Sequence, residues 1–193
     1  MFARLNYVGG DAPMGDVQIQ NVVAVANLHQ NINLHSIKKA LMNAEYRPKL
    51  FPGLVLRLKR PKTATLIFRT GKMVCTGAKS PKMARRALRK VVRELKKVGI
   101  IILGEPDITI QNVVASAKLG ARVDLERAAR IMDNVMYEPE QFPGLVHRMV
   151  EPKVVLLVFH SGKIVITGAK SGKEAQDATD KLRTSLRDNH LLI

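Results

Sequence analysis

Cysteine is almost absent from this chain of 193 residues, and its single example, Cys75, follows the apolar residues Met73 and Val74. One thiol cannot form a disulfide within the chain or a cysteine metal cluster, so both are excluded. Apolar neighbours favour burial of a thiol as a small hydrophobic side chain. We therefore expect Cys75 to lie in the core.

Long apolar runs are also missing. No stretch reaches the ~18 residues of a membrane span, and residues 1–5 lack the apolar segment of a signal peptide. We therefore expect a soluble intracellular protein that has no membrane partner.

Catalytic groupings are missing as well. The five histidines are scattered without metal-ligand spacing, and no Ser-His-Asp or paired-carboxylate arrangement is visible. The segment Thr76–Ser80 is similar to part of the phosphate-binding loop motif, but it lacks the upstream glycine and the contiguous Gly-Lys-Ser of that motif. We predict a protein that is not an enzyme and that needs no cofactor and no metal.

Acidic residues are scarce, with 16 Asp and Glu against 32 Lys and Arg, which gives a net charge of +16. Such an excess indicates an anionic partner, although charge also keeps a protein soluble. Residues 1–104 hold 20 basic and 4 acidic residues, whereas residues 105–193 hold 12 of each. Much of the excess falls on one predicted helix, which is either a docking site for acidic partners or a solvated face.

Most of the sequence consists of two tandem copies of one repeat. Three segments recur at a constant offset of 91 residues (110 − 19 = 91): Ile19–Ala24 as Ile110–Ala115, Phe51–Val55 as Phe142–Val146, and Thr76–Ser80 as Thr167–Ser171. A period this long excludes a solenoid and indicates a duplication folded as a pseudo-twofold pair. We divide the chain into a flexible arm (1–15), a first repeat (16–104) and a second repeat (105–193).

Each repeat contains the same predicted elements. Asn33 and Asp124 are good caps for a short helix, and Pro81 suits the first turn of a long one. In the first repeat we expect a strand near 17–23, a helix at 34–43, strands at 54–59, 63–68 and 72–76, and a helix at 81–98. The second repeat ends in a helix at 173–187. The pattern predicts an α+β fold, with an antiparallel sheet and helices on one of its faces.

The strands are apolar on both sides, although helices can cover only one. A large bare apolar sheet face is rare unless something binds there. Alternation along the strands assigns to the uncovered side Asn21, Val23, Leu66, Phe68, Val74 and Thr76, with their repeat mates Asn112, Val114, Leu157, Phe159, Val165 and Thr167.

Basic residues recur around this set at equivalent positions: Arg57 and Arg148, Lys62 and Lys153, Lys72 and Lys163, Lys79 and Lys170. An apolar centre with a cationic rim suits an opened DNA minor groove, where A·T pairs offer only acceptors and the rim binds phosphates. A sheet that binds RNA or single strands by base stacking is the alternative. For each Phe, the alternative interpretation is an ordinary core residue.

The motifs resemble the TATA-box binding protein family over residues 16–190. The most specific are Ile-Gln-Asn-Val-Val, Tyr137–Leu145, Ser161–Lys163, and Thr-Gly-Ala-Lys-Ser in both repeats. The short arm and the Phe-Pro-Gly of both repeats are more similar to the archaeal branch than to the eukaryotic one. An archaeal member is expected in the cytoplasm or nucleoid, and a eukaryotic one in the nucleus.

The resemblance implies a saddle, in which a curved ten-stranded antiparallel sheet holds the TATA box in its concave face and carries helices on its convex face. It implies that Phe51 and Phe68 wedge open one end of the site, and Phe142 and Phe159 the other. The Asn and Thr pairs would bond base acceptors, and the valines would pack on the groove floor. The family is itself the standard example of minor-groove binding with apolar wedges, so these roles come from the resemblance.

The resemblance also implies a general transcription initiation factor that recruits transcription factor B and RNA polymerase. The factor B contact falls on Glu138 and Glu140, whereas the first repeat has Arg47 and Lys49 there, a departure from the acidic residues expected of archaeal members. We expect this difference to determine which repeat recruits the factor. The sequence leaves open whether the free protein forms a homodimer through its apolar face.

Overall fold

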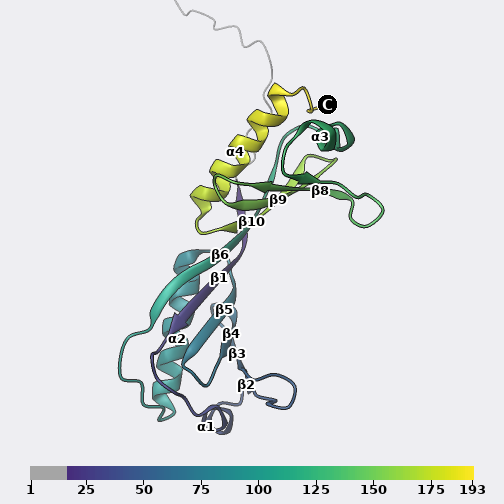
Figure 1. The fold of residues 1–193 in the computed structure, drawn as a ribbon. Helices are drawn as coiled ribbons and strands as arrows, with labels where there is room; N and C mark the ends of the chain where they lie inside the picture. The colour runs from purple at the N-terminus through teal and green to yellow at the C-terminus, as the bar shows by residue number, and fades with distance from the viewer. Residues whose placement is uncertain (1–16) are drawn as a thin grey trace, which may run out of the picture. The chain divides into compact units, whose positions relative to one another are not determined.

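The computed structural model describes residues 17–193, so the predicted arm at residues 1–15 lies outside the described residues. Its strands form one ten-stranded sheet in the order β2-β3-β4-β5-β1-β6-β10-β9-β8-β7 (Figure 1). One compact unit contains Ile19–Ala115 and Thr167–Ala175, and the other contains Ser116–Ile166 and Gln176–Ile193. The units differ from the sequence repeats because most of the strand that opens the second repeat packs with the first unit.

The described elements follow the same order in both repeats. The first repeat forms β1 (Gln18–Asn27), α1 (Leu34–Ala40), β2 (Ala44–Glu45), β3 (Leu54–Lys59), β4 (Lys62–Ile67), β5 (Lys72–Ala78) and α2 (Pro81–Lys97). The second forms β6 (Asp107–Lys118), α3 (Leu125–Ile131), β7 (Val135–Met136), β8 (Gly144–Met149), β9 (Val154–Phe159), β10 (Lys163–Ala169) and α4 (Gly172–Asp188). The predicted α+β class with an antiparallel sheet is confirmed.

Both predicted helix caps are confirmed. The Asn33 side chain accepts a hydrogen bond from the Ser36 N–H at 3.1 Å, and Asp124 accepts one from the Arg127 N–H at 3.0 Å. Each cap satisfies one of the backbone donors that the first turn of a helix leaves unpaired.

The predicted helix at 34–43 is too long, because α1 ends at Ala40 and Leu41 is already extended. The chain leaves the helix there so that Ala44 and Glu45 can pair with β3 as the strand β2. Two-residue strands such as β2 and β7 have no alternation to detect, which is why the pattern yielded four strands per repeat rather than five. The first strand also runs further than predicted, to Asn27.

The core of each unit lies between the sheet and its long helix. In the first repeat Leu88 and Val91 of α2 are fully buried, as are Leu56 and Cys75 of the sheet. Each leucine or valine buried in this way contributes about 1.5–3 kcal/mol relative to exposure. Cys75 is a core residue as predicted, and this burial raises the pKa of its thiol.

A lysine links the long helix to a β-hairpin in both repeats. Lys90 Nζ donates to the carbonyl of Arg60 at 2.7 Å, and Lys181 Nζ donates to the carbonyl of Glu151 at 2.7 Å. The donors and the acceptors are both 91 residues apart (181 − 90 = 151 − 60 = 91). The duplication therefore extends to individual polar contacts between helix and sheet.

Candidate nucleic-acid interface

The face of the sheet without helices is half-exposed along every long strand, and we call it the open face. In the first unit it presents Asn21, Val23, Val25, Val55, Arg57, Ala64, Leu66, Phe68, Lys72, Val74 and Thr76. Their neighbours along the strands, such as Val22, Thr65 and Cys75, are buried toward the helices. The structure thus places every predicted base-contacting residue of the first repeat on the side of the sheet that sequence alternation assigned to it.

A row of apolar side chains crosses four strands of this face. Val25 pairs with Val74, Val74 with Leu66, and Leu66 with Val55. Val25, Val55 and Ala64 were not among the predicted contact residues, nor were Ser116, Val146 and Val155 at the equivalent positions. Period-two alternation applied to the full length of each strand identifies all six.

Two phenylalanines form an edge-to-face pair on each unit. The ring centroids of Phe51 and Phe68 are 5.9 Å apart at an interplanar angle of 64°, and those of Phe142 and Phe159 are 5.8 Å apart at 65°. Aromatic rings prefer this geometry, which adds about 0.5–1.5 kcal/mol to their burial. Phe51 remains 40% exposed, so the pair is not an ordinary part of the core.

A glycine makes room for each pair. A Cβ atom on Gly53 would lie 2.6 Å from Phe51 Cε1 and 3.1 Å from Phe68 Cε1. On Gly144 it would lie 2.7 Å from Phe142 Cε1 and 3.1 Å from Phe159 Cε1. Steric crowding therefore explains the glycine of the Phe-Pro-Gly motif in both repeats, because a residue without a Cβ lets the rings pack against the backbone.

An asparagine and a threonine are hydrogen-bonded on the open face of the first repeat. The Gly77 N–H donates to Asn21 Oδ1 at 2.7 Å, and Asn21 Nδ2 donates to Thr76 Oγ1 at 3.0 Å. Gly77 has φ +94°, a conformation that favours glycine and that directs its N–H at Asn21. With its oxygen held by the backbone, the Asn21 amide keeps one N–H for an external acceptor.

The second repeat holds the same arrangement. The Gly168 N–H donates to Asn112 Oδ1 at 2.7 Å, and Asn112 Nδ2 donates to Thr167 Oγ1 at 3.2 Å. Gly168 has φ +96°. Both asparagine side chains are therefore oriented by the backbone as hydrogen-bond donors, which the sequence could not show.

Basic residues border the open face of the first unit. A hollow of about 800 Å³ is lined by Arg57, Lys62 and Lys79 together with Asn21 and Thr76. Lys79 Nζ donates to the carbonyl of Gln20 at 2.6 Å, and Lys170 Nζ donates to that of Gln111 at 2.6 Å. These two ammonium groups are anchored to the protein's own backbone, and each keeps two further N–H groups as donors.

The remaining predicted rim residues are exposed. Lys72 lies on the open-face side of β5, and on the second repeat the exposed set is Arg148, Lys153, Lys163 and Lys170. Alternation places Arg148 and Lys163 on the same side as Val146 and Val165, and it places Val114, Val155 and Leu157 there as well. Lys153 lies in the turn before β9.

The loops before the two Phe-Pro-Gly motifs share one backbone turn with opposite charges. Phe142 N–H donates to the Glu138 carbonyl at 2.9 Å, as Phe51 N–H donates to that of Arg47 at 3.0 Å. Glu138 and Glu140 are exposed on the turn of the second repeat. Arg47 on the other turn forms an ion pair with Glu45 at 3.0 Å.

Residues 17–193 offer no candidate for a metal site or for a membrane-spanning helix. No group of three or more His, Cys, Asp or Glu side chains in that range could hold a metal ion. Among the same residues, no helix is both long enough and apolar enough to cross a membrane.

His147 is the one half-buried histidine on a strand of the sheet. Burial lowers the pKa of its imidazole, and among the described residues Nδ1 has no hydrogen-bond partner. It occupies the position of the fully buried Leu56 in the first repeat (147 − 91 = 56). The residue is therefore a polar replacement in a core position rather than part of the open face.

Comparisons with known proteins agree with the fold and the repeats. The family model described as "Transcription factor TFIID (or TATA-binding protein, TBP)" matches residues 16–98 and 107–189. The TATA-box-binding protein of Pyrodictium occultum is 54% identical over 175 residues, which are 91% of this chain and 88% of that protein. The one from Archaeoglobus fulgidus is 49% identical over 89% of this chain and 94% of its own length.

A solved structure gives the same result. The structure titled "Methanococcus jannaschii TBP" superposes with a TM-score of 0.83 and 48% sequence identity, covering 90% of this chain and 99% of that one.

Proposed function

The chain belongs to the TATA-box-binding protein family, and we propose that its open face binds the minor groove of a TATA element and kinks the DNA. The family is one of general transcription initiation factors rather than enzymes. The observation that carries the proposal is the pair of edge-to-face phenylalanines beside a sheet face that is mainly apolar. An exposed apolar surface of this kind needs a partner that covers it.

The oriented asparagines explain why the partner would be rich in A·T pairs. The minor groove of A·T pairs offers only acceptors, whereas a G·C pair adds the guanine amino donor. Asn21 and Asn112 each present an N–H because their oxygens are held by glycine N–H groups. A guanine amino group would meet these donors and the valines without an acceptor, and would lose its hydration.

The phenylalanine pairs supply wedges that enter a base step. Unstacking a step costs a few kcal/mol, and full burial of one Phe side chain contributes about 1.5–3 kcal/mol. The two effects are of similar size, so two rings and the neighbouring valines offset the distortion. Specificity then depends on how easily the sequence deforms, which favours flexible TA steps.

The rim residues would bind the backbone on either side. Arg57 and Lys72 are the charged residues of the open face in the first unit, and with Lys62 and the equivalents on the second repeat they would contact phosphates. Phosphate contacts add affinity without sequence information and make binding salt-dependent.

The protein would act by assembling a larger complex. We assign the contact with transcription factor B to the exposed Glu138 and Glu140, and the complex would then recruit RNA polymerase. The first repeat shows Arg47 and Lys49 on the same turn, so only the second repeat offers an acidic loop. The apolar open face would also pair two free molecules as a homodimer when no DNA is present.

A competition gel shift tests the proposal. Labelled TATA duplex is bound and then challenged with unlabelled TATA duplex, with a G·C duplex of equal length, and with each single strand. The proposal expects only the TATA duplex to compete well. Equal competition by single strands would instead support a sheet that stacks unpaired bases, and it would refute minor-groove binding.

A further inference from the structure

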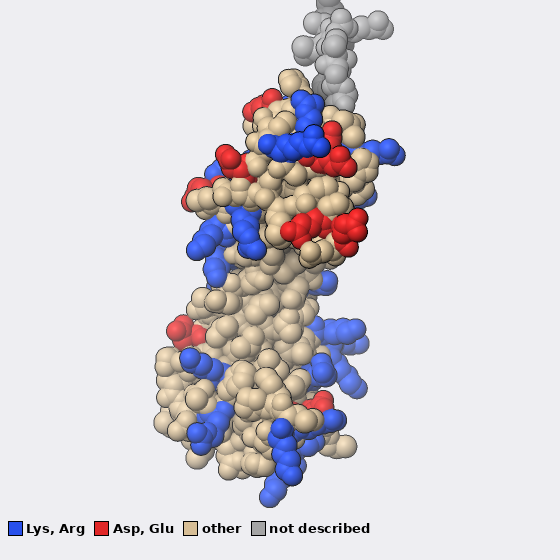
Figure 2. Space-filling model, turned by 45° about the vertical axis from the view of Figure 1, so that its right-hand side comes forward, with Lys and Arg blue, Asp and Glu red and all other residues tan. Residues whose placement is uncertain are grey.

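The long helix α2 has a charged surface that the proposed function does not use. Every exposed residue between Pro81 and Lys97 is basic: Lys82, Arg85, Arg86, Arg89, Arg93, Lys96 and Lys97. We call this set the α2 basic face. In Figure 2 acidic side chains gather mainly on the unit that contains α3 and α4, whereas the other unit shows mostly Lys and Arg.

The α2 basic face points away from the open face. Ala84, Leu88 and Val91 are fully buried, and α2 packs through them on β3, β4 and β5. The open face lies on the other side of the same strands. A duplex seated on the open face is therefore separated from α2 by the thickness of the sheet.

The equivalent helix α4 shows that the fold does not need such a surface. Asp177, Asp180 and Thr184 stand where α2 has Arg86, Arg89 and Arg93 (177 − 86 = 180 − 89 = 184 − 93 = 91).

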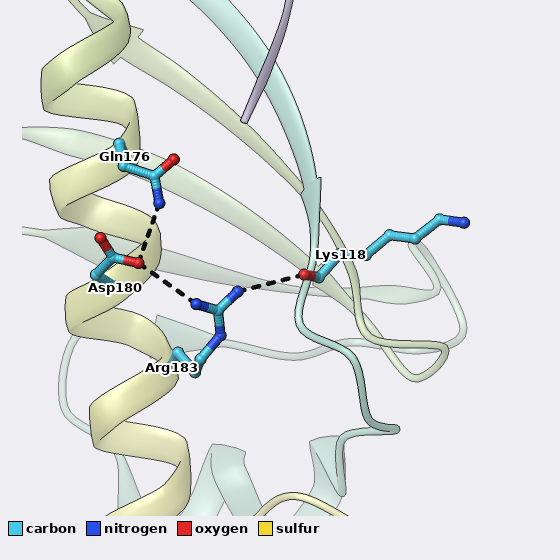
Figure 3. A network of polar contacts seen from close by, with 4 residues as sticks. All are labelled: Lys118, Gln176, Asp180 and Arg183. Atoms are coloured by element: carbon cyan, nitrogen blue, oxygen red, sulfur yellow. Dashed lines mark hydrogen bonds and ion pairs between the residues drawn. The ribbon is translucent and has the colours of Figure 1, made fainter. Parts of the chain in front are cut away.

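The polar groups of α4 also bond one another, as Figure 3 shows. Gln176 Nε2 donates to Asp180 Oδ1 at 3.1 Å, and Arg183 bridges Asp180 and the carbonyl of Lys118 at 3.4 Å to each. A helix in this position is therefore stable and solvated with mixed charge.

The cations of α2 repel one another. Arg85, Arg89 and Arg93 follow at intervals of four residues, a spacing at which like charges destabilise a helix. Arg85 donates to the carbonyl of Ile108, and Lys97 pairs with Glu94 at 3.1 Å. Within residues 17–193, no carboxylate lies within 4.0 Å of the guanidinium groups of Arg86, Arg89 and Arg93. A bound polyanion would relieve this repulsion.

The chemistry of the surface favours a phosphate backbone over an acidic protein. A hollow of about 570 Å³ is lined by six basic residues of α2, among them Arg86, Arg89 and Arg93, together with Val92 and Glu105. Protein–protein interfaces use arginine but are depleted in lysine, and they also centre on aromatic or apolar anchors. The exposed residues of α2 include three lysines, and none of them is apolar. Interfaces with DNA are polar and strongly positive. Residues four apart on a helix are about 6 Å apart along its axis, close to two phosphate steps of one DNA strand at about 3.4 Å each.

We propose that the α2 basic face is a second, sequence-independent binding surface for the backbone of duplex DNA. One molecule would then hold two duplex segments on opposite sides of its sheet. This site goes beyond the proposed function, which concerns the open face alone.

A bridging assay tests the proposal with the full-length protein. Biotinylated TATA duplex is immobilised in excess over protein, unbound protein is washed away, and a labelled G·C-rich duplex is added. The wild type should capture the labelled duplex and release it as salt rises. A variant with Arg86→Gln, Arg89→Gln and Arg93→Gln should stay on the immobilised duplex but capture at least tenfold less. The slope of the logarithm of its affinity for the second duplex against the logarithm of the salt concentration should become less steep. The change should be about 0.9 for each phosphate that the variant no longer neutralises.

A matched variant controls for net charge. Lys39→Gln, Arg122→Gln and Arg130→Gln remove three exposed cations from elsewhere, and capture should remain close to that of the wild type. Circular dichroism confirms that both variants keep their helices. Capture that is absent in the wild type, or equal in the Arg86, Arg89 and Arg93 variant, would overturn the proposal. Displacement of the second duplex by poly-glutamate at an equal concentration of negative charge would also overturn the proposal, because it would identify an acidic protein as the occupant. Failure of the first binding step would instead refute the proposed function.

Discussion

Phe142 and Phe159 meet edge to face, 5.8 Å between ring centroids, over Gly144, where a Cβ atom would lie 2.7 Å from the Phe142 ring. The same relationship joins Phe51 and Phe68 over Gly53. Because ring packing and glycine depend on each other, the orientation of the rings is built into the Phe-Pro-Gly turn. If the rings act as the proposed wedges, this packing preorganises them before DNA binds, which lowers the entropy lost on binding.

Replacing either glycine should displace a ring. Gly144→Ala places a Cβ 2.7 Å from Phe142 Cε1, and the half-exposed ring will move rather than the backbone. We expect TATA affinity to fall by about tenfold, a loss near the lower end of the 1–3 kcal/mol typical of overpacking, with a smaller DNA bend. Fluorescence anisotropy and energy transfer between duplex ends measure both. Gly104→Ala is the matched control, because a Cβ there contacts nothing within 4 Å. An unchanged bend in Gly144→Ala would show that ring placement is irrelevant.

Changing the asparagine donors to acceptors should abolish base discrimination. In Asn112→Asp the carboxylate cannot donate to a minor-groove acceptor, although it still accepts the Gly168 N–H. We expect binding to TATA duplex to weaken roughly tenfold to a hundredfold, in line with 1–3 kcal/mol for a good base contact. Binding to a G·C duplex should weaken less. Competition titrations at one salt concentration check this, and equal losses on both duplexes would remove the asparagine from base recognition.

The acidic loop at Glu138 and Glu140 should be required for binding transcription factor B and dispensable for binding DNA. Glu138→Arg with Glu140→Arg should abolish the ternary complex with transcription factor B while the binary complex forms normally. Electrophoretic supershift measures both steps. Arg47→Glu with Lys49→Glu changes the same backbone turn of the first repeat and should leave the ternary complex intact. A supershift that persists when Glu138 and Glu140 are both replaced would refute this assignment.

His147 should make the folded protein sensitive to mild acid. Burial lowers the pKa of its imidazole below the ordinary 6.5, so the unfolded chain binds the proton more readily than the folded one. This contribution to the stability is therefore fully present above about pH 6.5 and is lost as the pH falls below it. Urea unfolding between pH 7.5 and pH 5.5 should show a smaller loss in His147→Leu, which installs the residue of the first repeat. An equal loss in both proteins would assign the pH dependence to other groups.

The sequence predicted the elements that repeat or alternate, and it failed where tertiary contacts decide. Asn33, Asp124 and the three long strands of each hairpin region were predictable from caps and period-two patterns. The end of α1 was not, since the chain leaves the helix at Leu41 so that Ala44 can pair with Leu56. The orientation of Asn21 also could not be predicted, because it depends on the N–H of Gly77, a residue 56 positions away.

The kinking of DNA by the phenylalanine pairs is the central claim, and energy transfer between the two ends of a TATA duplex measures it most directly. The wild type should bend the TATA duplex sharply and leave a G·C duplex of equal length nearly straight. Phe142→Ala with Phe159→Ala should reduce the bend much more than it reduces salt-dependent binding to nonspecific DNA. A double variant that bends TATA DNA as strongly as the wild type would contradict the account.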